Sequence, residues 1–284
     1  MISIVICSRQ KDIDQKLKDN IKASVGCDFE LIVINNSNST YSIFQAYNIG
    51  LKKSKGAYVC FLHDDISIHT LGWGTIINKI FNNNNDIGLL GVAGATAKSK
   101  MPSAWWRCPE SHKRIKITQH SKHTSVEDYN SGFVDSLLEQ VVVIDGVFMV
   151  LRKDARISFR NDIAGFHNYD LNISFEYVKH KYKIFVTNEI SVEHFSAGSL
   201  NKDWIESTYR IHKLYADVLP LSIQNEGLGK HLEINNSKRF IKDCFKYNLN
   251  EIAFSTWTKL FLINPVSKYH IKFWTILIKK FSWM

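Results

Sequence analysis

The stretch Gly56-Ala57-Tyr58-Val59-Cys60-Phe61-Leu62-His63-Asp64-Asp65 decides the fold of this chain. Residues 58–62 are apolar or aromatic without a break, which is typical of a strand buried on both faces of a parallel sheet. The run ends on two adjacent carboxylates, and ligands of open α/β sheets bind beyond the carboxyl ends of strands. Two acids that lose water need a cation beside them. The stretch therefore predicts a divalent metal carrying a phosphate ligand or, as the alternative, a solvated turn.

Two strand–helix units precede this stretch. Ile2–Ile6 and Phe29–Ile34 are predicted strands. Apolar residues at a spacing of four predict a helix over Asp12–Ser24, with Asp12 as its cap, and a second helix runs through Phe44, Tyr47 and Leu51. Three strands alternating with two helices in about sixty-five residues indicate a βαβαβ nucleotide-binding half.

The later part of the chain alternates in the same way, except for one long polar stretch. From Ala97 to about Asn130 the pattern dissolves and predicts a long loop, and the Asn82–Asn85 run predicts a turn. We divide the chain into a domain over 1–220 and a basic, aromatic helical extension over 221–284. The further predicted elements are helices over Trp73–Phe81, after Asp170 and over Asp203–Leu219, and strands over Ile87–Val92, Leu137–Val143, Val147–Leu151, Lys183–Val186 and Ser191–Phe195.

Composition narrows the class of protein. The 284 residues are 45% hydrophobic and 22% charged, which is typical of a globular chain, and 36 basic against 27 acidic residues give a net charge of +9. That charge suits an anionic partner, but no signature of nucleic-acid binding is present. Five scattered cysteines predict a reduced, cytoplasmic protein. The N-terminus lacks the features of a secretory signal, and no apolar run is long enough to span a bilayer.

Seven short motifs, in this order and spacing, resemble the GT-A-fold glycosyltransferases of the inverting family 2 type over roughly residues 1–200. The resemblance implies an α/β fold with a mixed, mainly parallel sheet flanked by helices. The motifs are Cys7-Ser8-Arg9, Ile34-Asn35-Asn36-Ser37, Tyr47-Asn48-Ile49-Gly50, His63-Asp64-Asp65, Ile144-Asp145-Gly146, Gly165-Phe166-His167-Asn168-Tyr169-Asp170-Leu171-Asn172 and Val192-Glu193-His194.

The resemblance implies a metal site. His63-Asp64-Asp65 resembles the Asp-x-Asp motif of that fold, with a histidine where many members carry an acid. Asp65 would ligate Mn²⁺ or Mg²⁺, and Asp64 would reach the donor nucleotide. His194 matches a position that often supplies a further ligand, and imidazole favours Mn²⁺ over Mg²⁺. The alternative for His194 is a partly buried structural histidine.

The resemblance also implies catalytic and substrate contacts. Asp170 would be the general base that takes the proton from the acceptor hydroxyl, although its place before a helix also fits an N-cap. Gly146 would let the sugar approach the backbone, and the two adjacent tryptophans are either sugar-stacking or core residues. The implied nucleotide contacts are Cys7, Ser8, Arg9, Asn35, Asn36, Asn48 and Asp64, and the implied acceptor contacts are Trp105, Trp106, Asp145 and Gly146.

These expectations combine into one leading function. The chain would be a metal-dependent inverting transferase that moves a hexosyl or N-acetylhexosaminyl group from a nucleotide donor, with UDP expected, to a glycan or lipid-linked acceptor. The alternatives are a sugar nucleotidyltransferase, which would need a glycine in the loop after the first strand, and a binding protein that kept the fold without activity. The extension from Ser237 onward either lies on the cytoplasmic face of a membrane or packs on the domain or on a second copy.

Overall fold

The computed structural model describes all residues except 121–125, 197, 199, 224–228 and 282–284. Its first part is the predicted βαβαβ half. β1 pairs in parallel with both β2 and β3, which gives the spatial order β3-β1-β2. The five elements are β1 (Ile2–Ser8), α1 (Gln15–Ser24), β2 (Phe29–Asn35), α2 (Ile43–Lys53) and β3 (Tyr58–Leu62).

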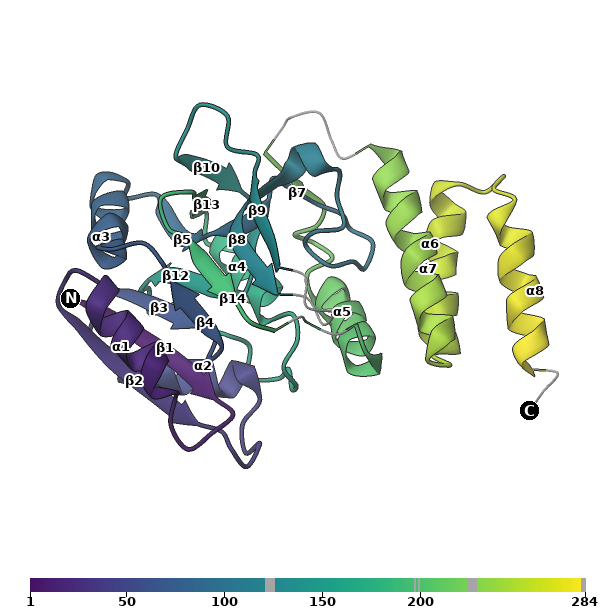
Figure 1. The fold of residues 1–284 in the computed structure, drawn as a ribbon. Coiled ribbons are helices and arrows are strands. Elements are labelled where there is room, and N and C mark those ends of the chain that lie inside the picture. The colour runs from purple at the N-terminus through teal and green to yellow at the C-terminus, as the bar shows by residue number, and fades with distance from the viewer. Residues whose placement is uncertain (121–125, 197, 199, 224–228, 282–284) are drawn as a thin grey trace.

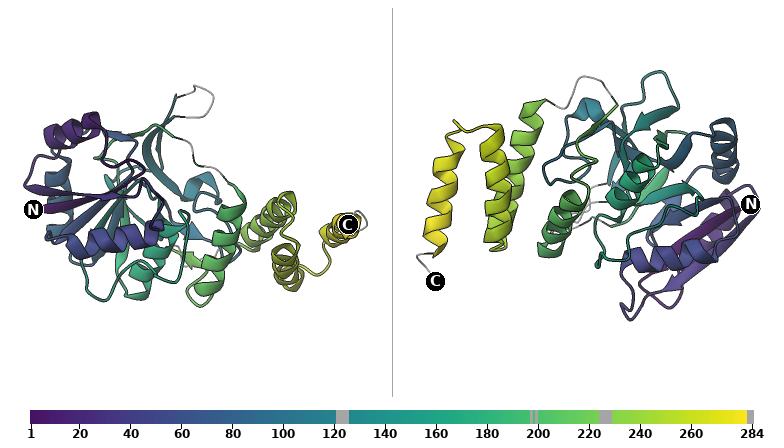
Figure 2. Two further views of the ribbon diagram at one scale, coloured as in Figure 1. Left: turned by 90° about the horizontal axis from the view of Figure 1, so that it is seen from below. Right: turned by 180° about the vertical axis from the view of Figure 1, so that it is seen from behind.

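The main sheet has seven strands in the order β10-β13-β5-β12-β3-β1-β2, with helices on both sides (Figures 1 and 2). β12 runs antiparallel to β3 and β5, and β10 runs antiparallel to β13. Every residue of β3 and β5 is buried, as their continuous apolar runs predict. The mixed α/β fold class is therefore confirmed. The remaining strands of this sheet are β5 (Ile87–Gly91), β10 (Leu138–Val141), β12 (Phe148–Arg152) and β13 (Lys183–Thr187).

A second sheet includes two strands, β8 and β9, from the stretch where the sequence predicts a long loop. Its order is β11-β6-β8-β14-β4, with β9 on the outer edge of β8. The prediction of a loop from Ala97 to Asn130 is wrong over β8 and β9. β8 is half exposed and β9 is exposed, and β8 carries polar residues around single apolar ones such as Ile115 and Ile117. Its strands are β4 (Ile66–Ile68), β6 (Ala93–Ala95), β8 (Lys113–His120), β9 (Val126–Ser131), β11 (Val143–Ile144) and β14 (Val192–His194).

A short antiparallel pair of strands joins the middle of the main domain to the residues just after position 220. β7 (Ala97–Lys98) pairs with β15 (Leu221–Ser222), and the turn η1 (Glu110–His112) precedes β8. The backbone N–H of Ile223 also donates to the carbonyl oxygen of Thr96 at 3.0 Å. Residues just beyond the division predicted at position 220 thus still pair with the larger domain.

Several helix ends differ from the predicted ones. The N-cap of α1 is Asp14, whose carboxylate accepts from the N–H of Lys16 at 2.7 Å, and not Asp12, which accepts from the N–H of Ile13 before the helix. The N-cap of α4 is Asn168, so Asp170 lies inside the first turn. α3 runs into the predicted Asn turn, and α5 ends before the predicted Leu219. These helices are α3 (Trp73–Asn83), α4 (Tyr169–Lys179) and α5 (Lys202–Leu214).

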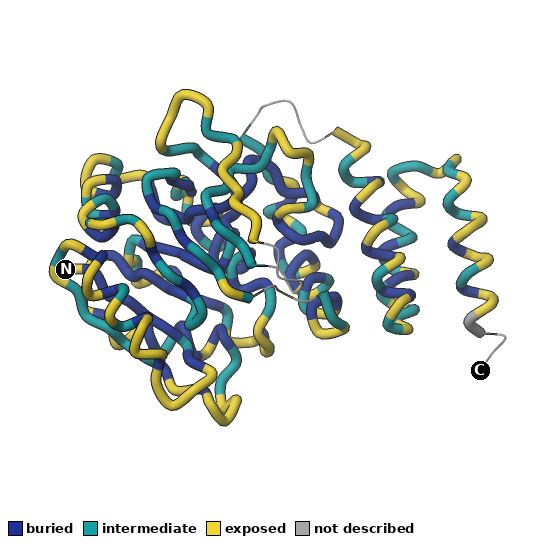
Figure 3. The backbone as a smooth tube through the Cα atoms, viewed as in Figure 1, coloured by how far each residue is buried: buried dark blue, intermediate teal, exposed yellow. Residues whose placement is uncertain are grey.

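The last three helices form an arm beside α5 (Figure 1). α6 packs on α5 through a second apolar core, which joins Trp204 and Ile205 of α5 to Ile234 and Phe240 of α6. α8 lies outermost and is largely exposed (Figure 3), with Phe273 buried against Trp257 of α7 in a stack at 5.0 Å. Among the described residues no helix is both long and apolar enough to cross a bilayer. The helices are α6 (Lys230–Lys246), α7 (Asn250–Ile263) and α8 (Tyr269–Phe281).

Candidate active site

Strand pairing brings two distant histidines to the end of β3. His63 and the two acids follow β3 directly, and β4 then pairs antiparallel with β14, so that His194 stands opposite Ile66. The backbone N–H of Phe195 donates to the carbonyl oxygen of Asp65 at 3.1 Å. The register of this short pair therefore places the His194 side chain beside that of Asp65.

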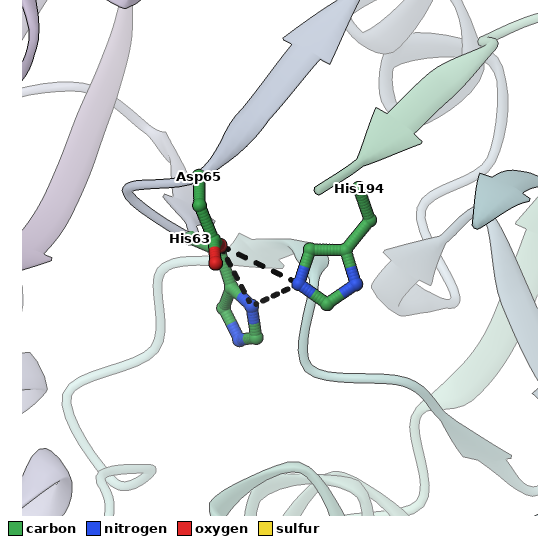
Figure 4. Close-up of side chains that lie close together, drawn as sticks. All are labelled: His63, Asp65 and His194. Atoms are coloured by element: carbon green, nitrogen blue, oxygen red, sulfur yellow. Dashed lines mark hydrogen bonds and ion pairs between the residues drawn. The ribbon is translucent and has the colours of Figure 1, made fainter. Parts of the chain in front are cut away.

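Three side chains converge there, and we call His63, Asp65 and His194 the His-Asp-His cluster (Figure 4). Nδ1 of His63 lies 3.2 Å from Nε2 of His194, and Oδ1 of Asp65 lies 3.4 Å from that nitrogen and 3.8 Å from His63 Nδ1. Atoms that bind one divalent ion at about 2.1 Å stand roughly 3–3.5 Å apart. The spacing and the donor set of two imidazoles and a carboxylate fit a single divalent cation.

The charges of the cluster favour a cation as well. Burial lowers the pKa of His63, and the neighbouring His194 lowers it further. Burial alone would raise the pKa of Asp65, but its polar contacts with His194 and Ser196 outweigh it and hold that pKa below its usual range. At neutral pH the cluster thus offers a neutral His63 imidazole and the Asp65 carboxylate.

Tyr169 holds His63 from behind. Its hydroxyl lies 2.5 Å from Nε2 of His63, and burial raises the pKa of this phenol well above its usual range. A Cβ on Gly146 would come within 2.3 Å of the Tyr169 hydroxyl oxygen. The missing side chain of Gly146 thus makes room for the Tyr169 ring.

Arg9 neutralises the two acids in this structure. Its backbone N–H donates to Oδ2 of Asp64 at 3.0 Å, and its Nη2 lies 2.8 Å from Oδ1 of Asp64 and 3.1 Å from Oδ2 of Asp65. β1 and β3 are parallel neighbours, so the residues after both strands meet at one edge of the sheet. The Arg9 side chain is 71% exposed, so it can turn to another anion without leaving a buried position.

Two cavities meet at this arginine, and both are bordered by Ser8, Arg9, Asp64 and Asp65. The second cavity, of about 460 Å³, extends along the start of α1 toward Phe195. The first cavity, of about 270 Å³, lies at the carboxyl ends of β1, β2 and β3. The first cavity is further lined by Cys7, Asn36, Ser37, Ser39, Ile43, Tyr47, His63, Phe166, Tyr169 and Ser196.

The pKa of Asp170 lies well above that of an ordinary aspartate. Burial raises its pKa to about 7, and the negative charge of Asp145 adds to this effect. Asp145 is held by two donors, the indole N–H of Trp105 at 2.8 Å and the backbone N–H of Val147 at 2.8 Å. A carboxylate with a pKa near the working pH is well suited to accept a proton in a reaction.

The family model called Glycosyltransferase like family matches residues 3–216. The chain belongs to this family. No curated protein sequence matches it. This glycosyltransferase is similar in structure to GalNAc-T7 with UDP, GalNAc and Mn²⁺, at a TM-score of 0.50 and 10% identity over 88% of this chain and 57% of that one. It is also similar to S. aureus TarS in complex with UDP-GlcNAc, at a TM-score of 0.49 and 12% identity over 99% of this chain and 80% of that one. The first likeness shows a fold shared with a glycosyltransferase.

The predicted nucleotide contacts of the glycosyltransferase divide into two groups. Five of them line the first cavity, namely Cys7, Ser8, Arg9, Asn36 and Asp64. The other two, Asn35 and Asn48, do not line either cavity.

The side chains of both asparagines are hydrogen-bonded within the protein. Oδ1 of Asn35 accepts from the backbone N–H and the hydroxyl of Ser37 in its own loop. Nδ2 of Asn48 donates to the carbonyl oxygen of Phe159 at 2.7 Å and to Oδ1 of Asn161 at 2.8 Å, and its Oδ1 accepts from the N–H of Phe159 at 3.0 Å. Asn48 thus joins α2 to the segment before α4.

The two tryptophans among the predicted acceptor contacts differ in burial. Trp105 is buried and bonded to Asp145, so it belongs to the core of the site, whereas Trp106 is 37% exposed. Sequence reasoning missed Tyr169 and took His63 only as a lost acid. The sequence does hold a signal for both residues: Tyr169 directly precedes Asp170, and His63 directly precedes the acid pair.

We expect Asn48→Ala to weaken the fold rather than to remove a ligand contact. Loss of three hydrogen bonds should lower the free energy of unfolding by roughly 1–3 kcal/mol, measured by urea denaturation. Asn35→Ala, on the exposed neighbouring loop, is the matched control and should change stability by less than about 0.5 kcal/mol. A variant Asn48→Ala of normal stability would contradict this role.

Proposed function

We propose that this glycosyltransferase moves a hexosyl or N-acetylhexosaminyl group from a UDP-linked donor to a hydroxyl of a glycan or lipid-linked acceptor, with inversion and with a divalent cation. The observation that carries the proposal is the His-Asp-His cluster, two of whose members, His63 and Asp65, line the first cavity at the ends of three strands. GalNAc-T7, solved with UDP, GalNAc and Mn²⁺, supports the choice of donor and metal. Two imidazoles in the cluster favour Mn²⁺ over Mg²⁺.

The donor nucleotide occupies the first cavity. Ser8 and Asn36 stand on its wall where β1 and β2 end, and Asn36 is held in place by two hydrogen bonds to the backbone of Tyr41, each of 2.9 Å. The guanidinium of Arg9 carries donors that match phosphate oxygens. The Arg9 guanidinium now contacts Asp64 and Asp65. A rotation of its side chain would bring it to a diphosphate bound beside the cluster.

The transfer itself is a displacement at the anomeric carbon. Asp170 takes the proton of the acceptor hydroxyl while the acceptor oxygen bonds to the anomeric carbon, and the bond from that carbon to the diphosphate oxygen breaks. The electron pair of that bond leaves with the nucleoside diphosphate. The cation, when bound, offsets the negative charge on this leaving group. Attack opposite to the leaving group inverts the configuration of the sugar.

The arm carries the features of a surface that lies on an anionic membrane. Residues 250–280 contain five lysines against one acid, Glu251. Large apolar residues stand exposed on the same two helices and the turn between them. A helix pair of this kind places its apolar side chains at the acyl boundary and its lysines on anionic headgroups. The exposed apolar residues include Phe254, Phe261, Leu262, Val266, Ile271 and Trp274.

On this proposal the enzyme works in the cytoplasm against the inner face of a membrane, where a lipid-linked acceptor would present its hydroxyl. A second copy of the chain packed on the same face is the competing arrangement. The two differ in whether lipid or protein concentration controls the association.

Metal dependence gives the first test. Mn²⁺ should raise the melting temperature of the wild type and accelerate hydrolysis of the UDP-sugar, because a ligand that binds only the native state stabilises it by mass action. Asp65→Ala should lose both effects. Asp162→Ala, which removes a surface partner of Arg160 away from the site, is the control and should keep both. Unchanged Mn²⁺ responses in Asp65→Ala would rule out the cluster as the metal site.

The pH dependence of transfer tests the base. Asp170 accepts a proton only when ionised, so kcat/KM should rise with pH up to about pH 7 and then level off. Asp170→Asn should reduce transfer roughly 10²–10⁴-fold and abolish this limb. Asp145→Asn removes the charge that raises the pKa of Asp170, so its limb should move to lower pH. A pH profile of Asp170→Asn identical to that of the wild type would mean that another group is the base.

Vesicle binding tests the arm. The full chain should sediment with vesicles of phosphatidylglycerol at low salt and not with neutral phosphatidylcholine vesicles. The double variant Leu262→Glu/Ile271→Glu should lose binding, because it puts charge where the apolar side chains enter the bilayer, and both positions are exposed, at 82% and 74%. Val134→Glu, exposed on the main domain at 88%, is the matched control. Absence of vesicle binding together with a concentration-dependent dimer would favour the second copy.

A further inference from the structure

Gln119 lies directly behind one member of the His-Asp-His cluster. Its Oε1 is 2.9 Å from Nδ1 of His194. Its Nε2 donates to three backbone carbonyl oxygens, those of Ser196 at 2.7 Å, His120 at 2.9 Å and His194 at 3.3 Å. The side-chain amide therefore has partners on both of its ends.

These contacts fix which way the amide faces. A carbonyl oxygen only accepts hydrogen bonds, so three of them together require the NH₂ group of Gln119 and exclude its oxygen. The oxygen must then face Nδ1 of His194. Since that oxygen is itself an acceptor, Nδ1 of the neutral ring carries the hydrogen, and Nε2 carries the lone pair.

The lone pair of His194 Nε2 then faces the cluster. This nitrogen lies 3.2 Å from Nδ1 of His63 and 3.4 Å from Oδ1 of Asp65. An imidazole binds a metal through its unprotonated nitrogen, and the hydrogen bond at the other nitrogen selects which one that is. We propose that Gln119 is a positioning residue that holds His194 in the Nδ1–H form and aims Nε2 at the divalent cation. This inference rests on the proposed metal dependence.

The backbone explains why Gln119 is in place. β8 and β14 are parallel, and Gln119 stands opposite His194 in their register. His120 follows Gln119 and Glu193 precedes His194, so both point to the other face of the sheet, where Nε2 of His120 bonds Oε1 of Glu193 at 2.6 Å. The alternation of the strand thus separates a face that serves the cluster from a face that does not, and it supplies a matched control residue, His120.

The tautomer can be measured without metal and without turnover. In ¹⁵N-labelled protein at about pH 8, above the ordinary histidine pKa of about 6.5, the ring nitrogen shifts should show His194 with its hydrogen on Nδ1. The signal is assigned by its absence from His194→Gln. Gln119→Leu should release the ring to a mixture or to the Nε2–H form, and His120→Ala should leave it unchanged. A wild-type His194 that is protonated on Nε2 would overturn the inference, whatever the variants do.

Mn²⁺ affinity gives the second readout. Gln119→Leu should bind Mn²⁺ roughly 10–100-fold more weakly by electron paramagnetic resonance titration, and His120→Ala should bind it as the wild type does. Equal affinity in Gln119→Leu and the wild type overturns the positioning role alone. If the wild type binds no Mn²⁺, the metal of the proposed function is wrong and this inference falls with it. The wild-type tautomer separates the two failures even where Gln119→Leu does not fold.

Discussion

The structure depends on one constraint: a strand buried on both faces, β3, ends on two carboxylates that cannot lose water without a positive partner. Because the neighbouring β1 is parallel to β3, its own end brings Arg9 to those acids. The chain then turns at once into β4, whose pairing with β14 adds His194. The two acids after β3 thus have two groups beside them: Arg9 from the end of β1, and His194 from β14.

The parts of the fold that the sequence predicts are those where burial leaves a simple pattern. β1, β3 and β5 are continuous apolar runs because both of their faces are covered. β8 is half exposed, and its basic residues Lys113, Arg114 and Lys116 make the apolar–polar alternation of a strand hard to detect. Gln119 lies in that strand, so its relation to His194 depends on a strand register that no local pattern specifies. Likewise, only the tertiary contact with Asp145 decides that Trp105 is a core residue rather than a sugar platform.

The arm is joined through a loop to the part of the domain that holds Asp145. Both oxygens of Glu233 in α6 accept backbone N–H groups, from Lys100 at 2.7 Å and Met101 at 2.8 Å. The loop that they hold continues to Trp105, which donates to Asp145. Burial raises the pKa of Asp170, and the charge of Asp145 adds to this effect. Three acceptors also surround the buried Lys98 ammonium at the start of this loop. The arm is therefore tied by hydrogen bonds to the loop that leads to Trp105, the partner of Asp145.

The histidine at position 63 changes the electrostatics of the cluster in a consistent way. An acid there would add a third carboxylate beside Asp64 and Asp65, and Arg9 is the guanidinium that both of these acids share. A neutral imidazole provides a ligand atom without that repulsion, and burial together with His194 keeps it neutral by lowering its pKa. The cost is a weaker attraction for a hard cation and a need to orient each ring. Tyr169 meets that need for His63, as Gln119 does for His194, so two outer residues accompany the exchange of a carboxylate for an imidazole.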